Sequence, residues 1–163
     1  MTDSEKLKHK LWTEMQSQMT VMLQLAGSDA VDPRPMTAIS DEKGEEHGPL
    51  WFFTATDTSL SRALSGPMPA VATFTAKGQD LFATIRGTLT RSDDRQVIDR
   101  LWNPFVAAWY PEGREDPTLT LLRMDLHAAE IWETGSSIVT GVKALMGADL
   151  RRDMQDKAAE VRL

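Results

Sequence analysis

Residues 34–62 carry cationic, aromatic and hydroxyl side chains in an order that suits a phosphorylated molecule with a flat ring. Arg34–Ile39 and Leu50–Thr54 read as two strands that pair across a polar turn. Asp57–Arg62 then opens a short, hydroxyl-rich helix that ends at Gly66. The free N–H groups and the positive dipole end of a helix start attract anions. Because the aromatic strand beside them offers a surface for a ring, a phosphorylated aromatic cofactor would fit both halves.

Other kinds of chemistry are excluded by residue counts or by missing motifs. The chain has no cysteine, which excludes disulfides, thiolate nucleophiles and zinc–sulfur sites. Its histidines, His9, His47 and His127, lack the spacing of a helical metal site, so we expect no metal. There is no Gly-x-Ser-x-Gly elbow, Walker lysine motif or Gly-x-Gly-x-x-Gly loop. What remains is an enzyme whose chemistry comes from a bound cofactor, or a protein that performs none.

Length and charge indicate one cytoplasmic domain. The 163 residues suffice for a single core but not for two ordinary domains. With 18 Lys and Arg against 24 Asp and Glu, the net charge of −6 disfavours nucleic acid, although local cations can still hold one phosphate. No apolar run reaches the roughly 18 residues of a membrane span, and the charged start does not resemble a secretory signal. We therefore expect no membrane contact.

The elements that must position residues 34–62 are antiparallel strands with helices at the periphery. Helices are expected over Ser4–Ser17, where Thr2 and Glu5 have capping-box spacing, and in two pieces between Asp93 and Trp109. About six strands are expected, drawn from Met19–Ala26, Arg34–Ile39, Leu50–Thr54, Pro69–Thr75, Asp80–Thr90, Leu119–Leu126 and Ala128–Glu133. A helical tail is expected over about 136–163. The pattern predicts an α+β fold, a mainly antiparallel six-stranded barrel with peripheral helices, in one domain over 1–163.

Six short motifs together point to a known family. They are Arg34–Met36, Leu50–Thr54, Leu101–Asn103, Ala108–Gly113, Asp116–Pro117 and Ala129–Trp132. In this order and spacing, over roughly Leu7–Trp132, the chain resembles the general stress protein branch of the pyridoxamine 5′-phosphate oxidase-like, FMN-binding split barrels. The resemblance implies a split β-barrel and a homodimer with two flavin sites at the subunit interface.

The resemblance also implies which residues bind FMN. They are Arg34, Pro35, Met36, Trp51, Phe52, Thr54, Ser61, Arg62, Gln79 and Trp132. Arg34 is implied as the phosphate partner, and Thr54 as a hydroxyl donor near the ribityl-phosphate chain. Ser61 and Arg62 match a phosphate-binding turn, although the family's usual lysine is absent there. Trp132 matches a tryptophan near the partner's flavin.

Structural roles for the same residues stay open. Trp51 and Phe52 are strand neighbours, so only one can face the site, and either can belong to the core. Arg34 and Arg62 can be ordinary surface arginines, and Gln79 can owe its polarity to its turn.

The expected function is that of a flavin-binding, stress-related protein, with oxidoreduction of a small molecule as its activity. No catalytic residue is assigned, because the flavin would exchange the hydride. Vitamin B6 oxidation is disfavoured, since Glu133–Ser137 offers none of the arginine or histidine groups that hold that substrate in the family. Two alternatives remain: a non-catalytic protein that sequesters FMN, and a split barrel that has lost its cofactor and acts as an interaction module. The sequence also leaves open whether the flavin is FMN, FAD or a deazaflavin.

Overall fold

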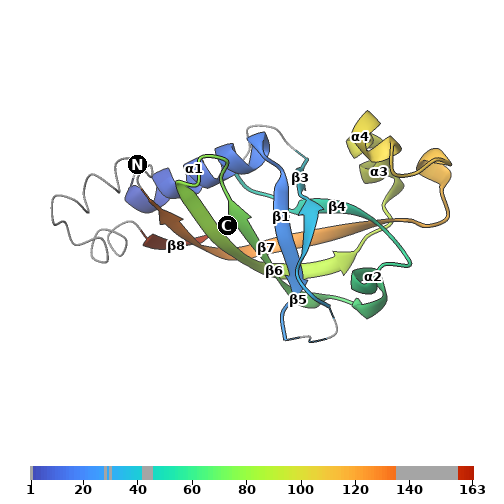
Figure 1. Ribbon diagram of the computed structural model, residues 1–163, viewed down its shortest axis with the longest axis horizontal. Helices are drawn as coiled ribbons and strands as arrows, with labels where there is room; N and C mark the ends of the chain where they lie inside the picture. Colours follow the sequence, from blue (N-terminus) through green and yellow to red (C-terminus); the bar gives the residue numbers. More distant parts are fainter. Residues whose placement is uncertain (1, 28, 30, 42–45, 135–157) are drawn as a thin grey trace.

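The structure, a computed structural model, describes residues 2–27, 29, 31–41, 46–134 and 158–163 (Figure 1). Its strands are β1 Thr20–Leu25, β2 Arg34–Thr37, β3 Ile39–Ser40, β4 Leu50–Ala55, β5 Met68–Thr75, β6 Leu81–Arg91, β7 Leu119–Glu133 and β8 Ala158–Arg162. Its helices are α1 Asp3–Ser17, α2 Ser59–Ala63, α3 Arg95–Leu101 and α4 Pro104–Ala107, with a 3-10 turn, η1, at Gly113–Glu115. None of these helices is both long and apolar enough to cross a bilayer.

All strands belong to one antiparallel sheet, which curls into a nearly closed barrel. The hydrogen-bonded order is β2-β1-β5-β6-β7-β4-β3, and β8 adds to β7. The two ends of this order meet because β2 and β3 are separated only by Ala38, whose N–H donates to the Met19 carbonyl. The segment that contains β2 and β3 therefore pairs first with β1 and then, within a few residues, with β4. β2 and β4 lie close together without a ladder between them, and this gap is the split of the barrel.

A continuous apolar core fills the barrel. Alternate strand residues such as Phe52 and Ile85 point inward and are fully buried. α1 covers the core with Leu11, Trp12 and Met15, and its start has the predicted capping box. Both faces of β4 are therefore covered, because a second apolar cluster packs on its outer side.

That second cluster lies between α3 and the outer face of β4 and β7. Trp51 and Leu121 come from the strands, and Val97, Ile98 and Leu101 come from α3. Burial of these large apolar groups attaches the segment between β6 and β7 to the barrel.

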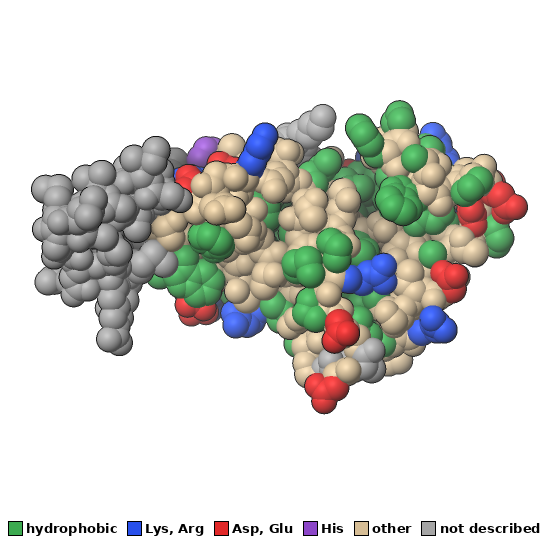
Figure 2. Space-filling model, in the orientation of Figure 1, with side chains coloured by type: hydrophobic (Ala, Val, Ile, Leu, Met, Phe, Trp, Pro, Cys, Tyr) green, Lys and Arg blue, Asp and Glu red, His purple; other side chains and the backbone are tan. Residues whose placement is uncertain are grey.

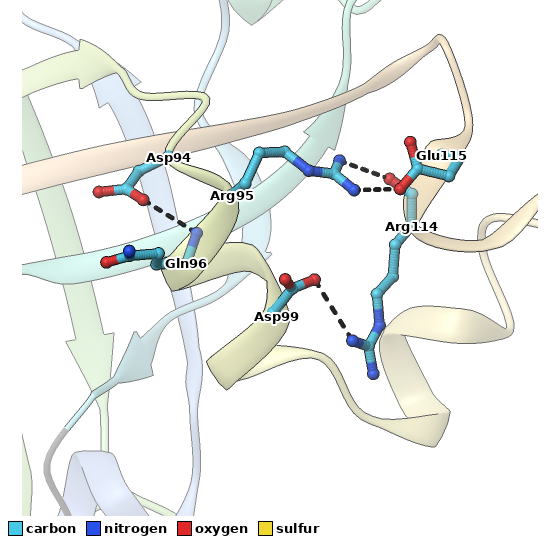
Figure 3. A network of polar contacts seen from close by, with 6 residues as sticks. All are labelled: Asp94, Arg95, Gln96, Asp99, Arg114 and Glu115. Atoms are coloured by element: carbon cyan, nitrogen blue, oxygen red, sulfur yellow. Dashed lines mark hydrogen bonds and ion pairs between the residues drawn. The ribbon is translucent and has the colours of Figure 1, made fainter.

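Ion pairs fix the same segment from the solvent side (Figure 3). Arg95 forms an ion pair with Glu115 and donates to the Arg114 carbonyl at 2.9 Å. The Arg114 guanidinium lies 3.3 Å from Asp99 on α3, whose start is capped by Asp94. These contacts hold η1 against α3 and so fix the aromatic residues between them.

Most predicted elements are confirmed, including the split barrel, the β5–β6 hairpin and the helix interrupted at Asn103 and Pro104. The expected count of about six strands is wrong, because the described residues alone form a sheet of eight. The two strands expected in 119–133 are one strand, β7, with an irregular register opposite Arg86 and Gly87. α2 begins at Ser59 rather than Asp57.

The predicted helical tail is wrong for its last residues. Ala158–Arg162 form β8 and pair with β7, and Val161 is buried in the barrel core. The Ala and Glu content of this segment favours a helix, but pairing with a strand edge and burial of Val161 override that local preference. The remainder of the predicted tail, 136–157, lies outside the described residues.

Candidate functional site

The hydroxyl-rich segment forms a tight turn between β4 and α2. Thr58 caps the helix, and its Oγ1 accepts a hydrogen bond from the Ser61 N–H at 3.2 Å. The Ser61 hydroxyl donates to the Ala55 carbonyl at 2.7 Å, and the Thr54 and Thr58 hydroxyls are 3.5 Å apart. Because the single hydroxyl proton of Ser61 is used inside the turn, this residue positions the turn rather than presenting a donor outward.

The dipole of α2 attracts an anion less strongly than that of a helix of ordinary length. It has five residues, so few peptide dipoles add up at its start. Leu60 is fully buried and anchors it, whereas Arg62 is exposed and has no ion pair with any described residue. Positive charge for an anion at this turn must therefore come mainly from side chains.

Arg34 supplies such a charge. It begins β2, is half-buried, and its side chain has neither a hydrogen-bond nor an ion-pair partner among the residues that the structure describes. β2 lies close to β4 without pairing with it, and β4 leads directly into the hydroxyl-rich turn. Partial burial of a guanidinium without a counter-charge is unfavourable, so this position favours an anionic ligand.

Trp51 and Phe52 lie on opposite faces of β4, and both are buried. Phe52 is fully enclosed in the barrel core. Trp51 lies under α3, with the Arg123 guanidinium 5.7 Å from its ring centroid, and its Nε1 has no hydrogen-bond partner among the described residues. Met36 is also buried, while Pro35 is exposed. Around the split, therefore, this strand pair presents backbone rather than an aromatic face, and Thr54, which is 5% exposed, is buried with its hydroxyl near that of Thr58.

An aromatic cluster that the sequence analysis did not assign to the site lies next to the turn. The Phe53 and Trp102 ring centroids are 6.1 Å apart in an edge-on arrangement, and Trp102 is 6.3 Å from Tyr110. Thr56 donates to the Thr118 carbonyl at 2.8 Å, which joins the turn to the chain after η1. The alternation of β4, which puts Phe53 on the same face as Trp51, was the available signal.

The pKa of Tyr110, a member of this cluster, lies above its ordinary value. Burial raises the pKa of Tyr110 to about 12, and the negative charges of Asp116 and Asp57 act in the same direction. Because the folded-state pKa lies above the ordinary value of 10.0, the stabilisation is complete below pH 10 and is lost as the pH rises towards about 12.

Tyr110 is the single tyrosine of the chain, so tyrosinate absorbance reports it alone. We expect the native protein to titrate near 12 and the urea-unfolded protein near 10. Circular dichroism would check that the native sample stays folded over this range. A native midpoint near 10 would show that the Tyr110 hydroxyl is open to water.

Apolar side chains also project into solvent beyond this cluster. Phe105 is 85% and Trp109 82% exposed, and Figure 2 shows hydrophobic side chains gathered over α4. They extend from the same segment as Trp102, but they point away from the barrel core.

The remaining two predicted site residues lie at the other end of the sheet. Gln79 is exposed in the β5–β6 turn with φ of 54°, and its carbonyl accepts from the Thr134 hydroxyl at 3.2 Å. Trp132 is half-buried on the outer face, opposite Phe82. Thr54 pairs with Thr120, which lies twelve residues before Trp132 on β7, or roughly 40 Å along an extended strand. A single chain therefore separates Gln79 and Trp132 from Thr54 and from the turn with Ser61 that follows it.

Two surface hollows lie outside the predicted residues. One of about 320 Å³ is bordered by Gln24, Asp29, Asp32 and Pro33, and another of about 140 Å³ lies between Arg91, Arg95 and Arg114. The described residues contain no group of three or more potential metal ligands. Residues 135–137, on which the expectation against vitamin B6 oxidation partly rests, lie outside the described part of the chain.

Comparison with known proteins gives consistent matches over nearly the whole chain. A family model described as pyridoxamine 5′-phosphate oxidase like matches residues 6–156. A solved general stress family protein of Xanthomonas campestris pv. campestris is 46% identical, with a TM-score of 0.75 over 84% of this chain and 93% of its own. The general stress FMN/FAD binding protein of Xanthomonas citri is 44% identical, with a TM-score of 0.74 over 82% of this chain and 92% of its own. General stress protein 26 of a Jannaschia species is 29% identical, with a TM-score of 0.76 over 98% of this chain and 99% of its own. No curated protein matches.

Proposed function

Because the chain belongs to the pyridoxamine 5′-phosphate oxidase-like family, as its sequence motifs suggested, we propose that it is an FMN-binding, stress-related protein. The observation that carries this proposal is the half-buried guanidinium of Arg34, which has no partner among the described residues and begins the strand that lies along β4. A phosphate would satisfy that cation with charge-assisted, bidentate hydrogen bonds. The X. citri relative, which is described as an FMN/FAD binding protein, supports the same assignment.

Different residues around the split would bind different parts of FMN. Arg34 and the exposed Arg62 provide positive charge for the phosphate, and Ser61 keeps the turn in shape. Thr54 would donate near the ribityl chain, and the backbone from Arg34 to Met36 would border the ring. Gln79 and Trp132 are too far along the sheet from Thr54 and its turn to join them in one chain, so a second subunit would supply these two residues. This supports a homodimer with a shared site.

We propose oxidoreduction of a small molecule as the activity. Bound FMN would supply hydride transfer at its N5 atom. The protein's own contribution is binding, orientation and exclusion of water, since none of the ten predicted residues is a carboxylic acid, histidine, lysine or cysteine that could move a proton near neutral pH. The lack of such a proton-transferring side chain among these ten residues also favours a second candidate, a protein that binds or sequesters FMN without turnover.

The visible absorption spectrum of freshly purified protein tests the cofactor, and anaerobic addition of NADH or NADPH tests the activity. We expect a flavin spectrum, or saturable quenching of FMN fluorescence when the cofactor is added back. Bleaching of the bound flavin by reduced nicotinamide supports the enzyme, and a flavin that is never reduced supports the binding protein. Colourless protein that does not respond to FMN or FAD would refute the proposal and favour an interaction module.

A further inference from the structure

The turn between β5 and β6 holds Gln79 in an unfavourable backbone conformation. Its φ is 54°, and every other residue with positive φ in the described ranges of the chain is a glycine. A residue with a Cβ stays in this left-handed region only where the surrounding contacts impose it. The Gln79 side chain is exposed and forms no hydrogen bond with any residue that the structure describes. Packing of that side chain within the turn therefore does not explain the strained conformation.

Contacts from the end of β7 fix this turn from outside. The Gln79 N–H donates to the Ala76 carbonyl at 2.9 Å, which closes the turn itself. The Thr134 hydroxyl donates to the Gln79 carbonyl at 3.2 Å, and the Thr134 N–H donates to the Asp80 carbonyl at 2.7 Å. The position of Gln79 therefore depends on how firmly Asp80 is held against the residues that end β7.

Lys10 on α1 joins these two segments. Its Nζ lies 3.3 Å from Oδ2 of Asp80 and 3.2 Å from Oε2 of Glu133. The three side chains are 35%, 34% and 37% exposed, so water screens these ion pairs less than it screens pairs between fully exposed groups. Leu81, which follows Asp80, is the register partner of Glu133. Without Lys10, the two carboxylates would therefore lie close together and repel each other.

We propose that Lys10 is a positioning residue for Gln79, which it holds in the conformation that binds the flavin. This inference rests on the proposed function, in which Gln79 contributes to a flavin site. A side chain whose backbone is already in the bound conformation binds more tightly, because less conformational freedom is lost on binding. Trp132 is not held in the same way, since neighbouring strand residues point to opposite faces and Glu133 points towards α1.

A double-mutant cycle tests whether Lys10 acts through Gln79. In fluorescence titrations, Lys10→Met and Gln79→Ala should each bind FMN about three- to tenfold more weakly, the equivalent of one hydrogen bond. The double variant K10M/Q79A should bind no more than about twofold more weakly than Gln79→Ala, because a side chain that is absent cannot be misplaced. Losses that multiply in the double variant would overturn the inference, and so would an unchanged affinity of Lys10→Met.

Two further variants distinguish positioning by charge from a general loss of structure. Lys10→Arg keeps the cation and should recover most of the affinity, and an arginine variant as weak as Lys10→Met would count against the ion pairs. Lys6→Met is the matched control, because Lys6 is an exposed lysine of the same helix that pairs only with Asp3 among the described residues. Its affinity for FMN should equal that of the unmodified chain.

The strain at Gln79 supplies a readout that a purely structural role would not give. Gln79→Gly should melt at a higher temperature than Gln79→Ala, because glycine adopts positive φ without a steric cost. Both variants should nevertheless bind FMN equally weakly, since both lack the amide side chain. A glycine variant that binds FMN as tightly as the unmodified chain would show that this side chain is not used, and would overturn the inference.

The inference and the proposed function fail in different ways. An unmodified chain that binds neither FMN nor FAD refutes both. An unmodified chain that binds FMN no better than Lys10→Met does retains the flavin but removes the role of Lys10. Should Lys10→Met fail to fold by circular dichroism, Glu133→Gln replaces it in the cycle, because it breaks one of the two ion pairs. Its smaller loss of affinity should vanish in the Gln79→Ala background, and a loss that persists there overturns the inference.

Discussion

Replacement of Arg34 by alanine should weaken FMN binding ten- to hundredfold without unfolding the protein. A charge-assisted hydrogen bond contributes about 1.5 to 3 kcal/mol, which corresponds to this range in the dissociation constant. Arg34 is half-buried at the start of β2 and has no polar partner among the described residues, so its removal breaks no hydrogen bond or ion pair with them. Fluorescence titration with FMN measures the effect.

Riboflavin, which lacks the phosphate, separates phosphate binding from ring binding in the same experiment. Its affinity should be similar for the original protein and for Arg34→Ala, because Arg34 is assigned to the phosphate alone. Arg91→Ala is the matched control, since Arg91 is exposed and its ion pair is with Asp93, away from the split. Equal losses for FMN and riboflavin would show that Arg34 shapes the ring site or the fold instead.

Replacement of Gly87 by alanine should destabilise the barrel by about 3 kcal/mol, the upper part of the usual range for overpacking. A Cβ built at Gly87 would lie 2.1 Å from the carbonyl oxygen of Asp125, and this neighbour is backbone that cannot rotate away. The position lies where β6 and β7 change register, so the close approach is part of the barrel's curvature. For a domain of this size, the melting temperature should fall by roughly 6 to 12 °C.

Gly78 provides the comparison for this substitution. It has an ordinary backbone conformation in the β5–β6 turn, and its added Cβ would meet the Asp80 side chain at 3.2 Å, which can shift. Gly78→Ala should therefore change the melting temperature much less than Gly87→Ala. Similar thermal stability of the two variants would show that the strands at Gly87 can separate without loss.

Local interactions in the sequence determined most of the elements. The capping box at Thr2 and Glu5, the Lys77–Gln79 turn and the break at Pro104 each act within a few residues, so their helices and hairpin could be predicted. The order and spacing of the motifs likewise identified the family, because those motifs keep their spacing along the chain.

Tertiary structure decided which residues are available to a ligand. Alternation along β4 required Trp51 and Phe52 to face opposite ways, but only the later packing of α3 buries Trp51 as well. β8 exists because Val161 reaches the core beside β7, a contact between distant parts of the chain that overrides local helix preference. The separation of Trp132 from Thr54 likewise depends on which strands pair across the barrel, and strand pairing over long sequence distances is not encoded in any short segment.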